Sequence, residues 1–326
     1  MPKLTRRTLL AGAMATPLAA PYVARAQTWP SGITRIVVPF PPGGTVDPIA
    51  RMVQPALQSR LGATVVIENK PGASGSIGAS QVAKSAPDGT SWLFVFDTHA
   101  VNPALMNLSF DSEKDLDPVL LIGTAPNVLA THRSRPFRGL GDMVDAAKAK
   151  PDGITFASVG TGSLGHLSMT VLGKRAGVRW THVPYRGGGP AMNDAIAGHV
   201  DSIIASAALV TPQVKANALR GVVTTGAMRL KSLPDVPTAI ESGFPGFESY
   251  AWWGVFAPGG TPKPLVDRFA GELIAALREE RVTRQLEDSL QIKLVLGGPE
   301  ELRTFFAEQM RVWGAVVREN GFRADS

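Results

Sequence analysis

The stretch Thr34-Arg-Ile-Val-Val-Pro-Phe-Pro-Pro-Gly-Gly-Thr-Val-Asp47 decides the fold class, because it leads from a β-branched run through a loop into a helical pattern. Residues 34–39 predict a strand, since Ile and Val favour extended structure. Residues 47–60 predict a helix with Asp47 at the N-cap and Pro48 at the first helical position. A strand that passes through a glycine-rich loop into a helix is the building unit of parallel sheets with flanking helices.

The same alternation continues along most of the chain. A second glycine-rich loop, Val159-Gly-Thr-Gly-Ser-Leu-Gly-His166, separates a predicted strand at 154–158 from a predicted helix at 164–176. We therefore expect an α/β protein with mainly parallel sheets and helices on both faces. Further strands are predicted at 64–68, 92–96, 119–122, 128–131, 181–183, 200–205, 219–224 and 250–256. Further helices are predicted at 75–84, 140–150, 190–197, 264–278 and 299–318, with a short helix between the strands at 200–205 and 219–224.

Length and composition set the broad class. A chain of 326 residues is long for a single hydrophobic core, so two domains are expected. With 44% hydrophobic and 18% charged residues, it is neither a disordered chain nor a charge-rich coiled coil. The absence of Cys from the sequence excludes disulfide scaffolds, thiolate metal sites and thiol nucleophiles.

The charge is concentrated at the start of the chain. Residues 1–26 contain four basic residues and no acidic one, whereas the remainder holds 29 Lys and Arg against 27 Asp and Glu. A nearly balanced remainder argues against a nucleic-acid-binding protein, which would carry a basic stripe.

Residues 1–26 have the pattern of an export signal. A basic start precedes the apolar stretch Leu9–Ala20, and Ala24-Arg-Ala26 supplies small residues for cleavage. Thr5-Arg-Arg-Thr-Leu-Leu10 resembles a twin-arginine signal, and an ordinary secretory signal that holds two arginines is the alternative. The apolar stretch is shorter than the roughly 20 residues that span a bilayer. We expect cleavage near Ala26 and a periplasmic protein.

The two glycine-rich loops are candidate anion sites. Glycine lets the backbone approach a ligand closely, and the first amides of the following helix point outward with partial positive charge. Two such loops facing one another could hold one carboxylate. We expect Ser163 to cap its helix while lining the pocket, His166 to lie in the first turn of that helix, and Asp47 to brace the first loop.

The second loop also matches a motif of another function. Gly160-x-Gly162-x-x-Gly165 matches the dinucleotide fingerprint, but no acidic residue for the ribose lies between Asp152 and Asp194. Because Arg179 or Arg186 could meet a phosphorylated ribose, an exported dinucleotide-dependent oxidoreductase stays as the alternative.

Two further kinds of site are disfavoured. Ser163 lacks a hydrolase elbow, since Thr161 stands where that motif needs glycine. The five histidines show no metal-ligand spacing, so neither a metal site nor a cofactor is expected.

Many segments in one order resemble the extracytoplasmic solute receptors of tripartite tricarboxylate transporters, the Bug family. The resemblance covers about Ile36 to Gly321. The segments that carry it are Val38–Gly44 with Asp47, Glu68–Ala73, Pro87–Thr90, Ala157–Ser163 with His166 and Leu167, His182–Gly187, Pro234–Thr238, Trp253–Pro258 and Gly260–Pro262.

The resemblance implies a two-lobed fold of the periplasmic-binding-protein type (type II), in which a hinge closes the lobes on a small ligand. Residues 27–126 and 248–326 would form one lobe, and residues 127–247 the other. Prolines from Pro234 to Pro264 surround the aromatic strand at 250–256, where the chain is expected to cross back between lobes; a long surface loop is the alternative.

The resemblance also implies site residues. One jaw would consist of Phe40, Gly43 and Gly44 with Asp47, and the other of Thr161, Gly162 and Ser163, followed by His166. Thr98 would add a pocket side chain, and Tyr185 and Arg186 would reach the distal part of the ligand. His99 and Arg186 depart from the family pattern and bear on specificity. The expected protein is a monomeric receptor, not an enzyme, that passes a carboxylate-bearing metabolite to membrane transporter subunits.

Overall fold

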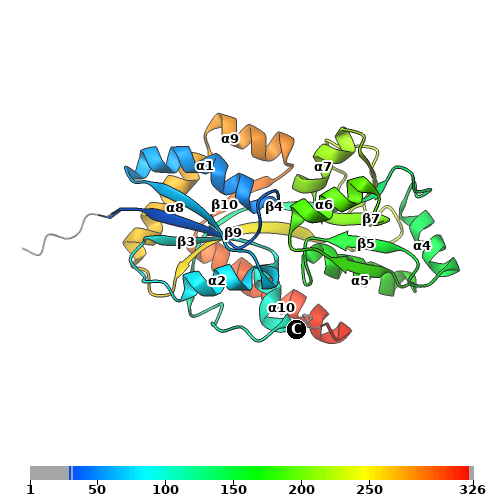
Figure 1. The fold of residues 1–326 in the computed structure, drawn as a ribbon, viewed down its shortest axis with the longest axis horizontal. Coiled ribbons are helices and arrows are strands. Elements are labelled where there is room, and N and C mark those ends of the chain that lie inside the picture. Colours follow the sequence, from blue (N-terminus) through cyan, green and yellow to red (C-terminus); the bar gives the residue numbers. More distant parts are fainter. Residues whose placement is uncertain (1–28, 31, 323–326) are drawn as a thin grey trace, which may run out of the picture.

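The structure is a computed structural model that describes residues 29–30 and 32–322 (Figure 1). The predicted export signal at residues 1–26 lies outside the described residues. Figure 1 shows two groups of strands and helices side by side, joined in the middle by the long strands β4 and β9. We call the group that contains the first strands lobe 1 and the other group lobe 2.

Lobe 1 is built on a mixed sheet in the order β2-β1-β3-β9-β4, with β10 also paired to β4. The first three strands are parallel, and the strands that follow them in this order are antiparallel to their neighbours. The strands are β1 (Thr34–Val38), β2 (Val65–Asn69), β3 (Ser91–Phe96), β9 (Tyr250–Pro258), the first part of β4 (Leu116–His132) and β10 (Lys293–Gly297).

Lobe 2 continues the sheet from the second part of β4 in the order β4-β7-β5-β6, with β8 paired to β4. Strand β5 is parallel to both β6 and β7, as the strand–loop–helix pattern predicts. The strands are β5 (Thr155–Ser158), β6 (Thr181–Pro184), β7 (Ser202–Ser206) and β8 (Leu219–Thr224).

Strand β4 connects the two lobes, and it corrects the prediction of two separate strands at 119–122 and 128–131. It pairs with β9 up to Pro126 and with β7 from Asn127 onward. Shifts in register between Pro118 and Leu120 and between Leu121 and Gly123 absorb the irregularities that Pro and Gly introduce. The lobe boundaries at 126/127 and 247/248 stay a prediction.

Helices cover the sheets, and most of them begin within two residues of the predicted positions. The structure adds α3, α9 and β10, which were not predicted; α3 contains Pro103. The helices of lobe 1 are α1 (Val46–Leu61), α2 (Ser76–Ala83, after a 3₁₀ turn at Ala73–Gly75), α3 (Thr98–Leu105), α8 (Lys263–Leu277), α9 (Glu280–Arg284, before a π turn at Gln285–Ser289) and α10 (Pro299–Asn320). Those of lobe 2 are α4 (Leu140–Ala149), α5 (Leu164–Ala176), α6 (Gly188–Ala197) and α7 (Ala207–Lys215).

Aromatic side chains form much of the core of lobe 1. Trp92 stacks on Phe269 with ring centroids 3.8 Å apart. Trp252 and Trp253 on β9 are buried in this core. Burial of each such ring contributes about 1.5–3 kcal/mol, which makes this lobe a firm support for the loops at its strand ends.

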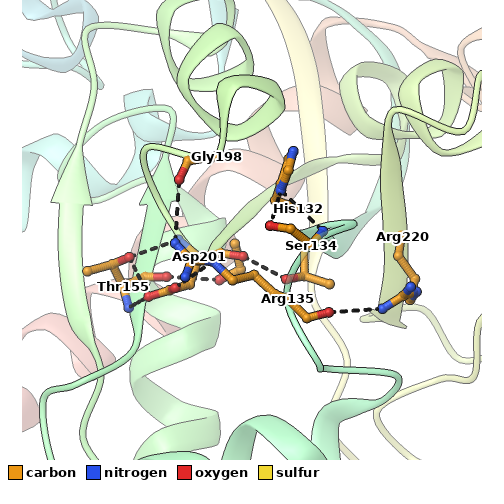
Figure 2. A network of polar contacts seen from close by, with 9 residues as sticks. His132, Ser134, Arg135, Thr155, Gly198, Asp201 and Arg220 are labelled. Atoms are coloured by element: carbon orange, nitrogen blue, oxygen red, sulfur yellow. Dashed lines mark hydrogen bonds and ion pairs between the residues drawn. The ribbon is translucent and has the colours of Figure 1, made fainter.

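A polar network holds the strand ends of lobe 2 that lie away from the glycine-rich loop (Figure 2). Asp201 precedes β7, and its carboxylate accepts hydrogen bonds from the amide and hydroxyl of Thr155 on β5, both 2.8 Å long. Arg135 pairs with the same carboxylate at 3.0 Å, and Arg220 donates to the carbonyl oxygen of Arg135. These bonds fix the start of β5 and β7, whose other ends lead into α5 and α7.

Candidate functional site

A cavity of about 1150 Å³ lies between the lobes. Its walls combine the loops after β1 and β5, the turn before α2, the end of α3, the loop after β6 and the end of α10. The lining residues are Pro39–Pro41, Gly72–Gly75, Pro103–Asn107, Val159–Thr161, Pro184–Gly187, Val317, Arg318, Gly321 and Phe322. Of the predicted site residues, Phe40, Thr161, Tyr185 and Arg186 line this cavity.

The start of α1 differs from the prediction. Thr45 is the N-cap and the helix begins at Val46, so the expectation that Asp47 caps the helix is wrong. The Asp47 carboxylate instead accepts hydrogen bonds from Arg51 Nε at 2.9 and 3.0 Å and from Asn69 Nδ2 at 2.9 Å. Asn69 Nδ2 also lies 3.0 Å from the carbonyl oxygen of Phe40. Asp47 thus braces the first loop through Asn69 rather than through the helix amides.

The glycines of the first loop face the start of α6 across the gap between lobes. A methyl group on Gly188 would lie 3.4 Å from Gly44 Cα, and one on Gly189 would lie 3.4 Å from the carbonyl carbon of Gly43. The lobes are therefore in contact here. Gly44 and Asp47 line a separate cavity of about 20 Å³, room for about one water molecule.

The second loop is partly tied to its own helix. Ser163 is the N-cap of α5 and its side chain accepts a hydrogen bond from the His166 amide, which confirms the predicted cap. The Gly162 amide donates to His166 Nδ1 at 3.2 Å. Gly162, Ser163 and His166 are buried and lie behind the stretch of loop that faces the cavity.

A carboxyl group of lobe 1 accepts a hydrogen bond at the N-terminal end of α5. Asp97, which directly precedes α3, accepts a hydrogen bond from the Leu164 amide at 3.4 Å. Burial raises the pKa of the Asp97 carboxyl well above its usual value, against the lowering effect of the amides of Leu164 and Thr98. The side chain of Ser74 adds a second bond between lobes, donating to the Thr161 carbonyl oxygen at 2.9 Å.

His166 positions the second loop. Its ring stacks on His182 with centroids 3.8 Å apart, and His182 Nε2 lies 2.7 Å from Ser158 Oγ. Burial lowers the pKa of His182 to about 3, and its electrostatic interaction with His166 lowers it further. Through its bond with the Gly162 amide, His166 fixes the backbone at the start of α5.

Thr98 and His99 lie in the core of lobe 1 on α3, away from the large cavity. The His99 ring packs against Phe256 and Phe306, with centroids 5.0 and 5.2 Å away. Burial lowers the pKa of His99 to about 3, so its imidazole is neutral at neutral pH. In this conformation His99 shapes the core that supports the cavity.

Tyr185 and Arg186 differ in what they present to the cavity. The Tyr185 hydroxyl donates to Asp194 at 2.6 Å. Burial, followed by the effect of that hydrogen bond, raises the pKa of Tyr185 to about 12. Its ring therefore lines the wall while its hydroxyl is engaged. Arg186 is exposed, and among the described residues it forms no hydrogen bond or ion pair.

Several lining residues were missed by sequence reasoning. Ser74, Arg318 and Phe322 come from a tight turn and from the end of α10, far apart in the sequence. The positive φ angles of Ala73 and Ser74, +43° and +51°, show a turn that the small residues at 72–75 could have indicated. No local pattern distinguishes Arg318 from other helical arginines.

Gly165, the last glycine of the possible dinucleotide fingerprint, has a packing role. A methyl group there would lie 2.9 Å from the carbonyl oxygen of Ile204 on β7, so glycine lets α5 pack closely on the sheet. Within the described ranges there is no cluster of metal-ligating residues. No helix in that part of the chain is long and apolar enough to cross a bilayer.

A two-lobed α/β fold with a cavity between the lobes defines the class of periplasmic binding proteins, and comparison with known proteins supports this class. Residues 49–322 match the tripartite tricarboxylate transporter family receptor. The chain belongs to this family. Its members form a class of solute-binding receptors rather than of enzymes.

Individual relatives agree with the family. The chain is 33% identical to BugT of Bordetella pertussis over 93% of each chain. The structure of Rpa4515 from R. palustris with adipate is 30% identical with a TM-score of 0.86, covering 91% of this chain and all of that one. MatC from Rhodopseudomonas palustris with bound malate is 31% identical with a TM-score of 0.83, covering 89% and 100%. The resemblance to the Bug family and the two-lobed fold are thereby confirmed.

Proposed function

We propose that this protein is an exported receptor that captures a small carboxylate-bearing metabolite between its lobes. The observation that carries this proposal is the composition of the cavity wall. Glycine-rich loops from both lobes line it, and the charged side chains among its described lining residues are Arg186 and Arg318. Such a wall favours an anion. The structures of relatives with adipate and with malate support a carboxylate.

In the proposed mode of binding, the ligand bridges the loops of the two lobes. Phe40 and Pro41 contribute from lobe 1, and Gly160 and Thr161 contribute from lobe 2 at the positive end of α5. Arg186 lies on the lobe 2 side and binds the distal group of the ligand. A few charge-assisted hydrogen bonds of about 1.5–3 kcal/mol each are enough for micromolar affinity, about −8 kcal/mol.

Capture proceeds by closure of the lobes about β4 and β9. Strand β4 runs from one group of elements into the other, and β9 reaches the place where the groups meet (Figure 1); the contact between Gly44 and Gly188 corresponds to the closed form. Opening the lobes separates this contact and exposes the first-loop amides of Gly43 and Gly44. Hinge motion of this kind is general for two-lobed receptors.

The remaining parts of the proposal concern the surroundings of the receptor. The protein acts as a periplasmic monomer after export through the signal at residues 1–26. It hands its ligand to the membrane subunits of a tripartite tricarboxylate-type transporter, and it requires no cofactor.

Isothermal titration tests the proposal. The panel contains adipate, malate and a monocarboxylate, with the wild-type protein and two variants. We expect Arg186→Gln to weaken dicarboxylates more than the monocarboxylate. The control Arg179→Gln removes an exposed arginine of the same lobe that pairs with Asp152, and we expect it to leave binding unchanged. No heat with any acid would contradict the proposed function, and equal losses for all acids would place Arg186 outside the site.

A further inference from the structure

The cavity is lined by a second cationic side chain, Arg318, which comes from the other lobe than Arg186. Arg186 follows β6 in lobe 2, whereas Arg318 belongs to the last turn of α10 in lobe 1. Both line the same cavity. Among the residues that the structure describes, the guanidinium of Arg318 has no hydrogen-bond or ion-pair partner. The two lobes thus each direct one cation at the ligand space.

The position of the Arg318 side chain is set by a glycine one turn earlier. A methyl group on Gly314 would lie 3.3 Å from Arg318 Nη1 and 3.7 Å from Ala104 Cβ on α3. The guanidinium therefore lies back along α10, beside the seam with α3. Ala104 itself lines the cavity. The absence of a side chain at Gly314 leaves space for Arg318 at this wall.

The wall around Arg318 is largely apolar. Leu105 and Met106 end α3, and Val317 and Phe322 flank the arginine at the end of α10. Phe40 adds an aromatic ring from the first loop. Within the described lining no Asp or Glu faces these groups. A ligand that contacts both the glycine-rich loops and the two arginines therefore carries two negative groups on an apolar spacer.

We propose that Arg318 binds the second carboxylate of an elongated dicarboxylate together with Arg186, so that one arginine from each lobe holds the distal end of the ligand while the glycine-rich loops hold the first carboxylate. This inference rests on the proposed function and specifies its ligand class. Acids with a hydrocarbon spacer fit the apolar wall better than short hydroxylated acids, whose hydroxyl groups would lose water without a partner there. Because the two cations belong to different lobes, a diacid also favours the closed form more than a monoacid does.

The test compares adipate with hexanoate, which has the same six-carbon chain and lacks one carboxylate. We expect the wild-type protein to bind adipate at least about tenfold more tightly than hexanoate, the factor that one charge-assisted contact supplies. Arg318→Gln removes this preference by weakening adipate and sparing hexanoate. Arg318→Lys retains part of it. The control Arg303→Gln removes another exposed arginine of α10, one that pairs with Glu300, and keeps the wild-type ratio.

The outcomes separate the two proposals. If the wild-type protein binds adipate and Arg318→Gln keeps the full preference for it, the role of Arg318 is refuted while the receptor function stands. A wild-type protein that binds hexanoate as tightly as adipate also overturns this inference alone. If neither these acids nor malate binds, the proposed function fails as well. Thermal unfolding of each variant shows whether it is folded. If only Arg318→Gln fails to fold, the comparison of adipate with hexanoate is made with Arg318→Lys.

Discussion

Gly162→Ala provides a sharp test of the contact between the lobes. Gly162 has φ of +79°, and a methyl group there would lie only 2.0 Å from Leu105 Cδ1 on α3. The second loop and α3 belong to different lobes. The substitution therefore introduces an overlap that separation of the lobes can relieve, and it acts against the closed form.

The expected magnitude follows from two separate costs. A side chain in the left-handed region costs about 1–2 kcal/mol of stability. Overpacking against Leu105 adds about 1–3 kcal/mol to the closed form. Because only the second cost opposes closure, adipate affinity should fall by about tenfold or more.

Gly177→Ala is the matched control, since Gly177 ends the same helix with φ of +67° and no atom within 4 Å of the added methyl group. It should lose similar stability and keep wild-type affinity. Titration calorimetry and thermal unfolding of both variants provide the measurement. Adding Leu105→Ala to Gly162→Ala should restore part of the affinity. Equal affinities for Gly162→Ala, Gly177→Ala and the wild-type protein would show that the overlap with Leu105 does not oppose closure of the lobes.

Three further predictions concern the groups that support the site. Burial lowers the pKa of His99 from 6.5 to about 3, so as the pH falls His99 is protonated in the unfolded chain before it is protonated in the folded protein. The free energy of unfolding therefore has its full value above pH 6.5 and decreases as the pH falls, by roughly 2 kcal/mol at pH 5. Urea unfolding should show a smaller decrease for His99→Phe. A decrease equal to that of the wild-type protein would contradict the lowered pKa of His99. Burial raises the pKa of Asp97, so the folded protein loses stability as the pH rises above the usual pKa of a carboxyl group. Asp97→Asn keeps an acceptor for the Leu164 amide and should raise Tm at pH 7. A lower Tm would show that the charge of Asp97 is needed. Asn69→Ala removes the hydrogen bonds that connect the first loop to Asp47. We expect adipate affinity to fall by about tenfold and the free energy of unfolding to fall by about 1 kcal/mol. Unchanged affinity would show that the first loop does not contribute to the binding site.

The sequence predicted the elements whose local pattern and tertiary role agree. The β-branched run at 34–38 is strand β1, and the glycine-rich loop at 159–163 connects the end of β5 to the start of α5. Strand β4 was predicted in two pieces because Gly123 and Pro126 interrupt its apolar pattern. The long strand persists there because β9, β7 and β10 supply pairing that no local pattern reveals.

The candidate site shows the same limit. Asp47 followed by Pro48 has the local pattern of a cap, yet Arg51 and Asn69 take its carboxylate and Thr45 starts the helix. Arg318 lies more than a hundred residues from Arg186 in the sequence, and only packing of α10 against α3 brings both to one cavity. Local patterns therefore predicted the glycine-rich loops, whereas the cavity wall formed by the ends of α3 and α10 depends on long-range packing.

The most direct measurement is a crystal structure of the protein grown with adipate. We expect the acid between the lobes, with one carboxylate against Phe40 and Thr161 and the other within hydrogen-bonding distance of Arg186 and Arg318. Adipate bound elsewhere, or a cavity without acid at a concentration that saturates binding in solution, would contradict the claim that the space between the lobes is the receptor site.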